Sequence, residues 1–237
     1  MAKKKEKVDS QEKAMNLLNT CYDKCLEGIP KVSLSVEELA LDYLDKYDTK
    51  EKACKAMLKK QVIKCTTSGT LAGLGGIITL PVAVPANISS VLYVQMRMIA
   101  CAAYMFNYNL EDDETRTFIY ACLAGVSVSN IVKKAGIEFG TKYVNALIKR
   151  IPGTVFTQIN QKVGFRFITK FGETGIINLG KLVPGVGGVF GGAFDLLETK
   201  MIANRAYRWF CKNDFSNEKE NFDNEDVIID INDDELI

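Results

Sequence analysis

The chain has 237 residues, of which 47% are hydrophobic and 25% are charged. This is the balance of a globular protein, and it excludes collagen-like and wholly disordered chains. Histidine is absent, which excludes Ser-His-Asp and Cys-His nucleophile pairs, histidine-ligated zinc and a histidine pH switch. Charge is divided unevenly, because residues 1–212 carry a net charge of +10 and residues 213–237 carry −9.

The N-terminal part of the chain predicts a short charged start followed by helices. Residues 1–9 are strongly charged and are expected to form a disordered basic start. No apolar segment follows their lysines, so they are not expected to be a signal peptide. Apolar residues at helical spacing then predict an amphipathic helix over residues 11–26. Ser35 and Glu38 form the Ser-x-x-Glu pattern of a capping box, which opens a second helix whose apolar face extends to Tyr47.

A third helix is expected from Thr49, and it carries six lysines opposed by a single glutamate. The lysines are Lys50, Lys52, Lys55, Lys59, Lys60 and Lys64. A run of charge usually marks a solvated face, but this helix leads into 32 consecutive uncharged residues, Cys65 to Met96. Lysines beside an apolar segment are the usual construction of a contact with an anionic membrane, so these six are predicted membrane-surface residues.

The uncharged segment is divided by Pro81 and Pro85, and neither half suits a membrane span. The first half has 16 residues, or about 24 Å of helix against a hydrocarbon core of about 30 Å. The second half leads into a helix that carries Asn87, Gln95 and Arg97, which are costly at the centre of a bilayer. We therefore expect a broken helical hairpin, which either joins the core or dips into one leaflet.

The remaining elements are also expected to be helices. Four carboxylates at residues 111–114 complement the start of one, and further helices are predicted over residues 118–134, 137–150 and 153–160. Almost no segment alternates as a strand does. The predicted fold class is therefore all-α. We expect a single helical domain over residues 10–212, built around two glycine-rich apolar hairpins and followed by a disordered acidic tail, residues 213–237.

The seven cysteines are an odd number, and they lie without Cys-x-x-Cys spacing, mostly among apolar neighbours. Cys21 and Cys25 lie one helical turn apart, but no second pair of ligands exists to complete a zinc site. The cysteines are therefore predicted to be small buried hydrophobic side chains in a protein of the reducing cytoplasm, and neither a metal nor a cofactor is expected.

Motifs in both halves of the chain resemble those of a known family. The following segments resemble the C-terminal signature of the bacterial EcsC family: Val163 to Arg166, Thr169 to Gly172, Asn178 to Lys181, Pro184, Gly187-Gly188, Gly191-Gly192 and Asp195. Earlier segments are similar to the N-terminal half of that family: Gly69, Gly73 to Gly76, Pro81, Pro85, Gln95 to Arg97 and Tyr104 to Asp113.

This resemblance covers roughly residues 50–212 and leaves the first 49 residues and the tail outside. The chain departs from the family at Ala86-Asn87, where the family often has an acidic residue. The resemblance implies a helical, membrane-associated protein, and the family's name comes from an operon that encodes an ABC transporter. It implies no established activity.

Five polar residues of the second half form the candidate anion-binding or head-group-binding site: Arg166, Lys170, Asn178, Lys181 and Asp195. Arg166 and Lys170 lie four residues apart on one helical face, and Asn178 and Lys181 lie three apart. Two interpretations remain open. Either Asp195 is the buried counter-charge of one cation, or the cations bind a phosphate or an anionic head group while Asp195 orients one of them.

The sequence predicts a non-catalytic cytoplasmic protein, associated peripherally with the inner face of the cell membrane. Its expected partner is anionic lipid or a membrane protein, including a transporter-associated one. The alternatives are a hydrolase-type enzyme acting on lipid or phosphate esters, for which no nucleophile with its base is evident, and a membrane-perturbing effector. Nucleic acid is not expected, because aromatic residues are not interleaved with the lysines. The sequence does not determine the lipid, the partner or the oligomeric state.

Overall fold

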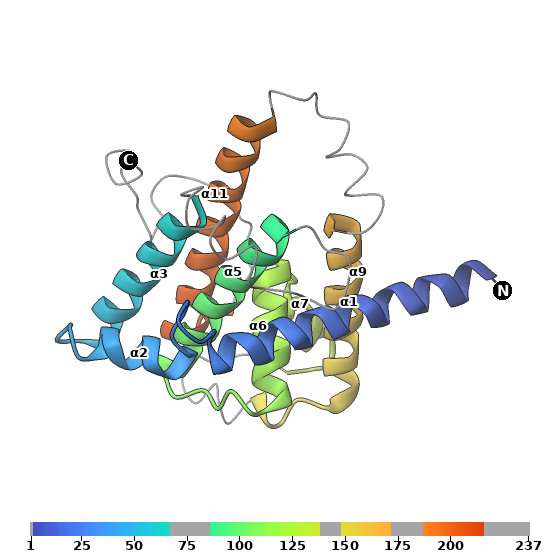
Figure 1. The fold of residues 1–237 in the computed structure, drawn as a ribbon. Coiled ribbons are helices and arrows are strands. Elements are labelled where there is room, and N and C mark those ends of the chain that lie inside the picture. The colour runs from blue at the N-terminus through green and yellow to red at the C-terminus, as the bar shows by residue number, and fades with distance from the viewer. Residues whose placement is uncertain (1, 67–85, 138–147, 172–186, 216–237) are drawn as a thin grey trace.

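The computed structural model of the chain describes residues 2–66, 86–137, 148–171 and 187–215. Across these ranges the chain forms eight α-helices and one π-helical turn, and no strand (Figure 1). The predicted all-α class is therefore confirmed. The glycine-rich parts of the two predicted hairpins lie largely outside the described residues.

The first helix, α1 (Ala2–Glu27), includes the start that the sequence analysis expected to be disordered, residues 1–9, from Ala2 onwards. Four of the nine residues of this start are lysines, joined by one alanine and one glutamate, and all three residue types are good helix formers. Leu18 and Tyr22 are fully buried, so α1 has the apolar face that the spacing predicted.

The predicted capping box opens α2 (Val36–Leu44). The Ser35 N–H donates to Glu38 Oε2 at 2.8 Å, and the Glu38 N–H donates to Ser35 Oγ at 3.1 Å. Helix α2 ends before Tyr47, which was predicted to lie on its apolar face. The third helix, α3 (Lys50–Thr66), begins after Thr49 as predicted.

Helix α5 (Ala86–Met105) begins in the last part of the uncharged segment. It is followed by α6 (Asp113–Ala124) and α7 (Val128–Lys134), in place of the single helix predicted over residues 118–134. That prediction was wrong because Gly125 has a φ of 64°, a left-handed conformation that ends a helix and that glycine adopts without strain.

The C-terminal half adds α9 (Gly153–Phe171), which runs well past the predicted end at Asn160. Helix α11 (Gly187–Ala206) follows and continues into the π-helical turn η1 (Tyr207–Cys211). Most of the helix predicted over residues 137–150 lies outside the described residues. None of the described helices combines the length and the apolar character needed to cross a bilayer.

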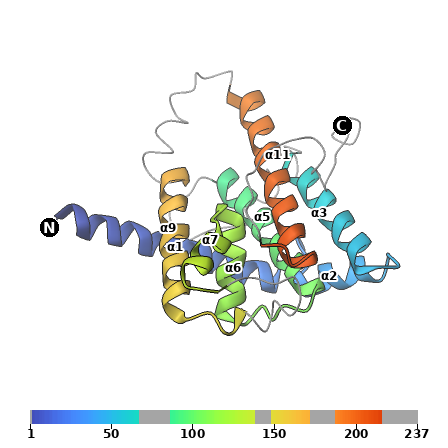
Figure 2. The same cartoon turned by 180° about the vertical axis from the view of Figure 1, so that it is seen from behind.

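Helix α5 is central, because it packs against α1, α2, α3, α6 and α11. Helices α3, α6 and α9 run in one direction and α5 and α11 in the other, while α1 crosses the bundle (Figures 1 and 2). The C-terminal ends of α3 and α9 and the N-terminal ends of α5 and α11 therefore lie at one end of the bundle, uppermost in Figure 1. We term it the upper end and the opposite one the lower end.

The core is one continuous cluster of aliphatic, aromatic and sulfur-containing side chains. All seven cysteines are buried, as predicted. The Sγ atoms of Cys54 and Cys211 lie 3.0 Å apart, where α3 meets η1. Phe215 is only 1% exposed, and its ring lies 5.4 Å from that of Trp209. The packed body thus continues past residue 212, where the sequence analysis placed the domain boundary.

Candidate functional site

Among the five predicted anion-binding residues, Arg166 is the one whose side chain the structure describes. It is exposed on α9, and its Nη1 donates to the carbonyl of Ala124 at 3.1 Å and to the carbonyl of Gly125. Arg205 of α11 donates from Nη1 to the carbonyl of Cys122 at 2.6 Å. The last carbonyls of a helix lack partners within it and carry partial negative charge, so two guanidinium groups complete the end of α6.

The other four members of the predicted site lie beyond what the structure describes. Lys170 and Asp195 belong to α9 and α11, but their side chains are outside the described part. Asn178 and Lys181 lie outside the described residues altogether. Whether Asp195 pairs with a cation, and whether these residues bind a head group together, therefore stay predictions.

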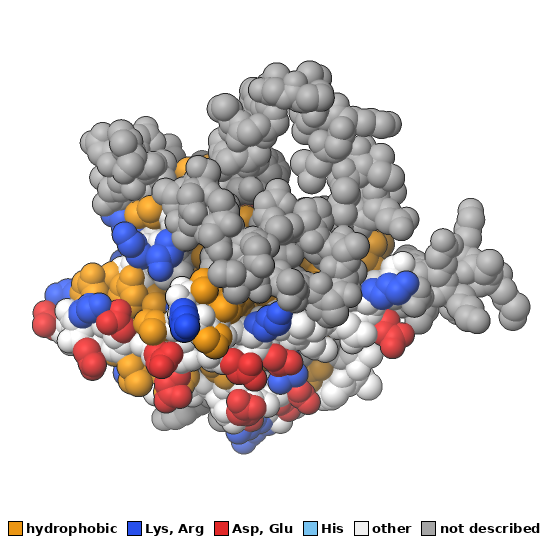
Figure 3. Space-filling view, in the orientation of Figure 1, with side chains coloured by type: hydrophobic (Ala, Val, Ile, Leu, Met, Phe, Trp, Pro, Cys, Tyr) orange, Lys and Arg blue, Asp and Glu red, His pale blue; other side chains and the backbone are white. Residues whose placement is uncertain are grey.

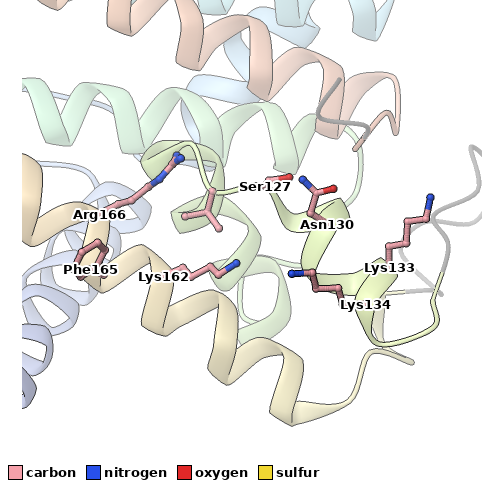
Figure 4. Close-up of a pocket in the computed structure, with 8 residues that line it drawn as sticks. Ser127, Asn130, Lys133, Lys134, Lys162, Phe165 and Arg166 are labelled. Carbon is pink, nitrogen blue, oxygen red and sulfur yellow. The ribbon is translucent and has the colours of Figure 1, made fainter. Parts of the chain in front are cut away.

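A cavity of about 860 Å³ opens beside Arg166, between α7 and α9 (Figure 4). Its polar lining consists of Ser127, Asn130, Lys133, Lys134, Lys162 and Arg166. Val126 and Phe165 add an apolar wall. The described lining residues carry four positive charges and no carboxylate, so the cavity has a strong positive potential.

The side chains of this cavity converge from two helices. Lys134 of α7 and Lys162 of α9 extend toward each other, Ser127 and Asn130 lie close together beside them, and Lys133 points away (Figure 4). The Oγ atom of Ser127 is buried and has no hydrogen-bond partner among the described residues. None of the three lysines forms a hydrogen bond or ion pair with another described residue. These lysines are therefore available to a ligand.

The sequence analysis missed the lysines of this cavity. Lys162 lies four residues before Arg166, a spacing that places both side chains on one helical face, so it was detectable. Lys133 and Lys134 belong to a different helix, and only the packing of α7 on α9 brings them to the same place.

The six predicted membrane-surface lysines of α3 are distributed along the whole helix. Lys52 pairs with Asp48 at 3.7 Å, and Lys50 lies beside it in the first turn, so both belong to the lower end. Lys55 lies further along the helix, with its Nζ atom 5.2 Å from the centre of the Tyr207 ring. These three lysines are therefore remote from the end where α3 leads into the glycine-rich stretch.

Lys59, Lys60 and Lys64 lie in the last two turns of α3, at the upper end. Burial, together with the positive charges of Arg97 and Lys60, lowers the pKa of the Lys64 ammonium. Arg97 of α5 is only 5% exposed, and its Nε has no hydrogen-bond partner among the described residues. No described carboxylate pairs with Lys60, Lys64 or Arg97, so positive charge accumulates here.

The fold and these sites define an all-helical protein with a cationic cavity and cations gathered at one end of its bundle. The chain belongs to the EcsC protein family, whose model matches residues 9–212. The expectation that the first 49 residues lie outside the family was wrong for residues 9–49, whose helices α1 and α2 pack against α5 as parts of the same fold. No curated protein and no solved structure gave a significant match.

Proposed function

We propose that the protein is a non-catalytic peripheral membrane protein of the cytoplasm, which binds the anionic inner face of the cell membrane with its upper end. One observation carries this proposal. Both glycine-rich stretches connect helices at the upper end (Figure 1), where Lys60 and Lys64 of the last turns of α3 have no acidic partner among the described residues.

The stretches that join the helices at the upper end are apolar in sequence. The first lies within the 32 uncharged residues, and residues 172–186 contain one glutamate and one lysine. Apolar segments flanked by lysines are attracted to a bilayer both by the hydrophobic effect and by charge. Each lysine near an anionic surface contributes about 1 kcal/mol.

Acidic residues gather toward the opposite end of the molecule. The α5–α6 loop and the first turn of α6 alone supply four, Glu111 to Glu114. In Figure 3 the acidic side chains of the displayed face lie over its lower half, while basic side chains over the upper part of α3 lie beside hydrophobic ones. An anionic membrane repels the lower end and attracts the upper end, so the charge distribution favours one orientation.

The first prediction tests this orientation with charge-removing substitutions at the upper end. Lys60→Gln combined with Lys64→Gln should weaken binding to phosphatidylglycerol vesicles, by up to about thirty-fold if each charge contributes about 1 kcal/mol. The measurement is vesicle co-flotation as a function of salt. Binding of the unmodified chain should weaken toward 0.15 M salt, where the Debye length is about 8 Å.

The matched control removes the same charge from the same helix at the lower end. Lys50→Gln combined with Lys52→Gln should bind vesicles within about twofold of the unmodified chain, because these charges lie far from the membrane in the proposed orientation. Equal losses in both double variants would contradict the orientation. Equal flotation with neutral and anionic vesicles at low salt would contradict the proposed function itself.

Three other functions stay predictions: binding of a membrane-protein partner, hydrolysis of lipid or phosphate esters, and perturbation of the membrane. No contact among the described residues favours any of them over lipid binding.

A further inference from the structure

We propose that the cavity between α7 and α9 binds a phosphomonoester group. The group belongs either to a lipid head group or to a soluble phosphorylated compound. The lipid source rests on the proposed membrane function, whereas binding of a soluble ester does not.

The charge of the cavity favours a doubly negative ligand. The ammonium groups of Lys134 and Lys162 extend toward each other, and Arg166 adds a third charge at the edge (Figure 4). Like charges that face each other in a partly enclosed space repel, and a bound anion removes the repulsion. A phosphomonoester carries close to two negative charges at neutral pH and balances both lysines. A monocarboxylate balances only one.

The hydrogen-bonding groups of the cavity match a phosphate as well. A terminal phosphate presents three acceptor oxygens, and the cavity offers donors from Lys134, Lys162, the Asn130 amide and the Ser127 hydroxyl. The buried Ser127 Oγ has no partner among the described residues. A buried hydroxyl without a partner is unfavourable, and an acceptor oxygen of the ligand would supply the missing hydrogen bond.

The size and the apolar wall of the cavity indicate an organic phosphate rather than the inorganic ion. A volume of about 860 Å³ lies within the range of small-molecule sites and far exceeds one phosphate group. Phe165 is 48% exposed and lies on the cavity wall, where its ring offers apolar surface to the carbon skeleton of the ligand. A glycerol-based phosphomonoester has both a phosphate group for the lysines and a carbon skeleton for the apolar wall.

The test substitutes the two facing lysines and leaves Arg166 in place, because Arg166 also completes the end of α6. For Lys134→Gln combined with Lys162→Gln, titration calorimetry with glycerol 3-phosphate should show at least tenfold weaker binding than for the unmodified chain. In a second arm, vesicles containing phosphatidic acid, which ends in a phosphomonoester, are compared with phosphatidylglycerol vesicles of matched surface charge. Any preference for phosphatidic acid should be lost in the same variant.

Two further variants separate a specific site from general attraction. Ser127→Ala removes a donor without changing the charge and should weaken ester binding severalfold. The Lys50→Gln and Lys52→Gln double variant loses the same charge at the lower end and should bind the ester as the unmodified chain does.

The two arms identify the source of the ligand. Binding of glycerol 3-phosphate without a vesicle preference supports a soluble ligand, and a preference for phosphatidic acid supports a lipid head group. The proposal is overturned if neither probe distinguishes the Lys134→Gln and Lys162→Gln variant from the unmodified chain. In that case, co-flotation of the protein with phosphatidylglycerol vesicles that depends on Lys60 and Lys64 would still support the proposed function. Failure of the phosphate-site proposal can therefore be distinguished from failure of the proposed function.

Discussion

Gln61 and Gln95 are both buried glutamines, but their surroundings differ. Gln95 of α5 donates from Nε2 to Thr199 Oγ1 of α11 at 2.8 Å. Gln61 of α3 is fully buried, and neither polar atom of its amide has a hydrogen-bond partner among the described residues. A satisfied buried amide stabilises the fold modestly, whereas an unsatisfied one costs about 1 to 3 kcal/mol. The two side chains should therefore respond oppositely to an apolar replacement.

We expect Gln61→Met to leave the free energy of unfolding unchanged or to raise it by about 1 kcal/mol, because the substitution removes an unsatisfied amide and keeps the volume. Gln95→Met should lower the free energy of unfolding by about 1 to 3 kcal/mol, because it leaves Thr199 without its partner. Urea unfolding with an unchanged m-value measures both. A loss for Gln61→Met as large as that for Gln95→Met would show that Gln61 has a polar partner in the native protein.

The helix α2 depends on its N-terminal cap, because nine residues are too few for a helix to be stable alone. The Glu38 carboxylate accepts the Ser35 backbone N–H, and this hydrogen bond, together with one from the Ser35 side chain, lowers the pKa of Glu38 below its usual value. A lowered pKa in the folded state means that the ionised carboxylate stabilises the fold. This contribution is present above the unfolded pKa, near 4.3, and is lost as pH falls through the folded value.

Glu38→Gln should therefore reduce the dependence of stability on pH. Between about pH 5 and pH 3 the melting temperature of this variant should fall less steeply than that of the unmodified chain. Thermal melts followed by circular dichroism across this range measure the difference. Glu37→Gln is the control, because it removes the same charge from the same turn without touching Ser35. Parallel curves for the unmodified chain and Glu38→Gln would mean that the capping box does not form in solution.

Local features of the elements could be predicted from the sequence, whereas features made by packing could not. The capping box was predictable because Ser35 and Glu38 lie three residues apart and need no distant partner. The break between α6 and α7 was missed because Gly125 stands in an apolar run. Its helix end is completed by Arg166 and Arg205, which come from α9 and α11.

The same distinction applies to the candidate site. Arg166 was predicted from its own helix, but the cavity beside it exists only because α7 packs on α9. The lysines that α7 contributes had no signal in their own sequence context, where a pair at a helix end is common.

The whole molecule combines a basic body with an acidic C-terminal segment, and the described part of the body extends to Phe215. Asp214 pairs with Arg208 at 2.9 Å, and Phe215 is buried against the aromatic core. The segment after Phe215 carries a net charge of −8. An acidic segment tethered to a basic body competes with other anions at an effective concentration in the millimolar range.

Deletion of residues 216–237 should therefore tighten binding to phosphatidylglycerol vesicles at low salt, and the gain should shrink as salt approaches 0.15 M. The deletion starts after Phe215, so that the packed ring and the Asp214 ion pair are retained. Flotation of both chains across a salt series measures the effect. If the shortened chain binds no more tightly than the full one, the acidic segment does not compete with the membrane.

Helix α1 is synthesised before the other described helices, yet it packs against α5 and α9, which are made much later. At about 5 to 20 residues per second, synthesis from the end of α1 to the end of α9 takes roughly 7 to 29 seconds. Throughout that interval the face that carries Leu18 and Tyr22 lacks its full set of partners. A nascent chain thus presents a lysine-rich amphipathic segment to chaperones and membranes before the rest of the protein exists, and the timing of translation sets how long it stays accessible.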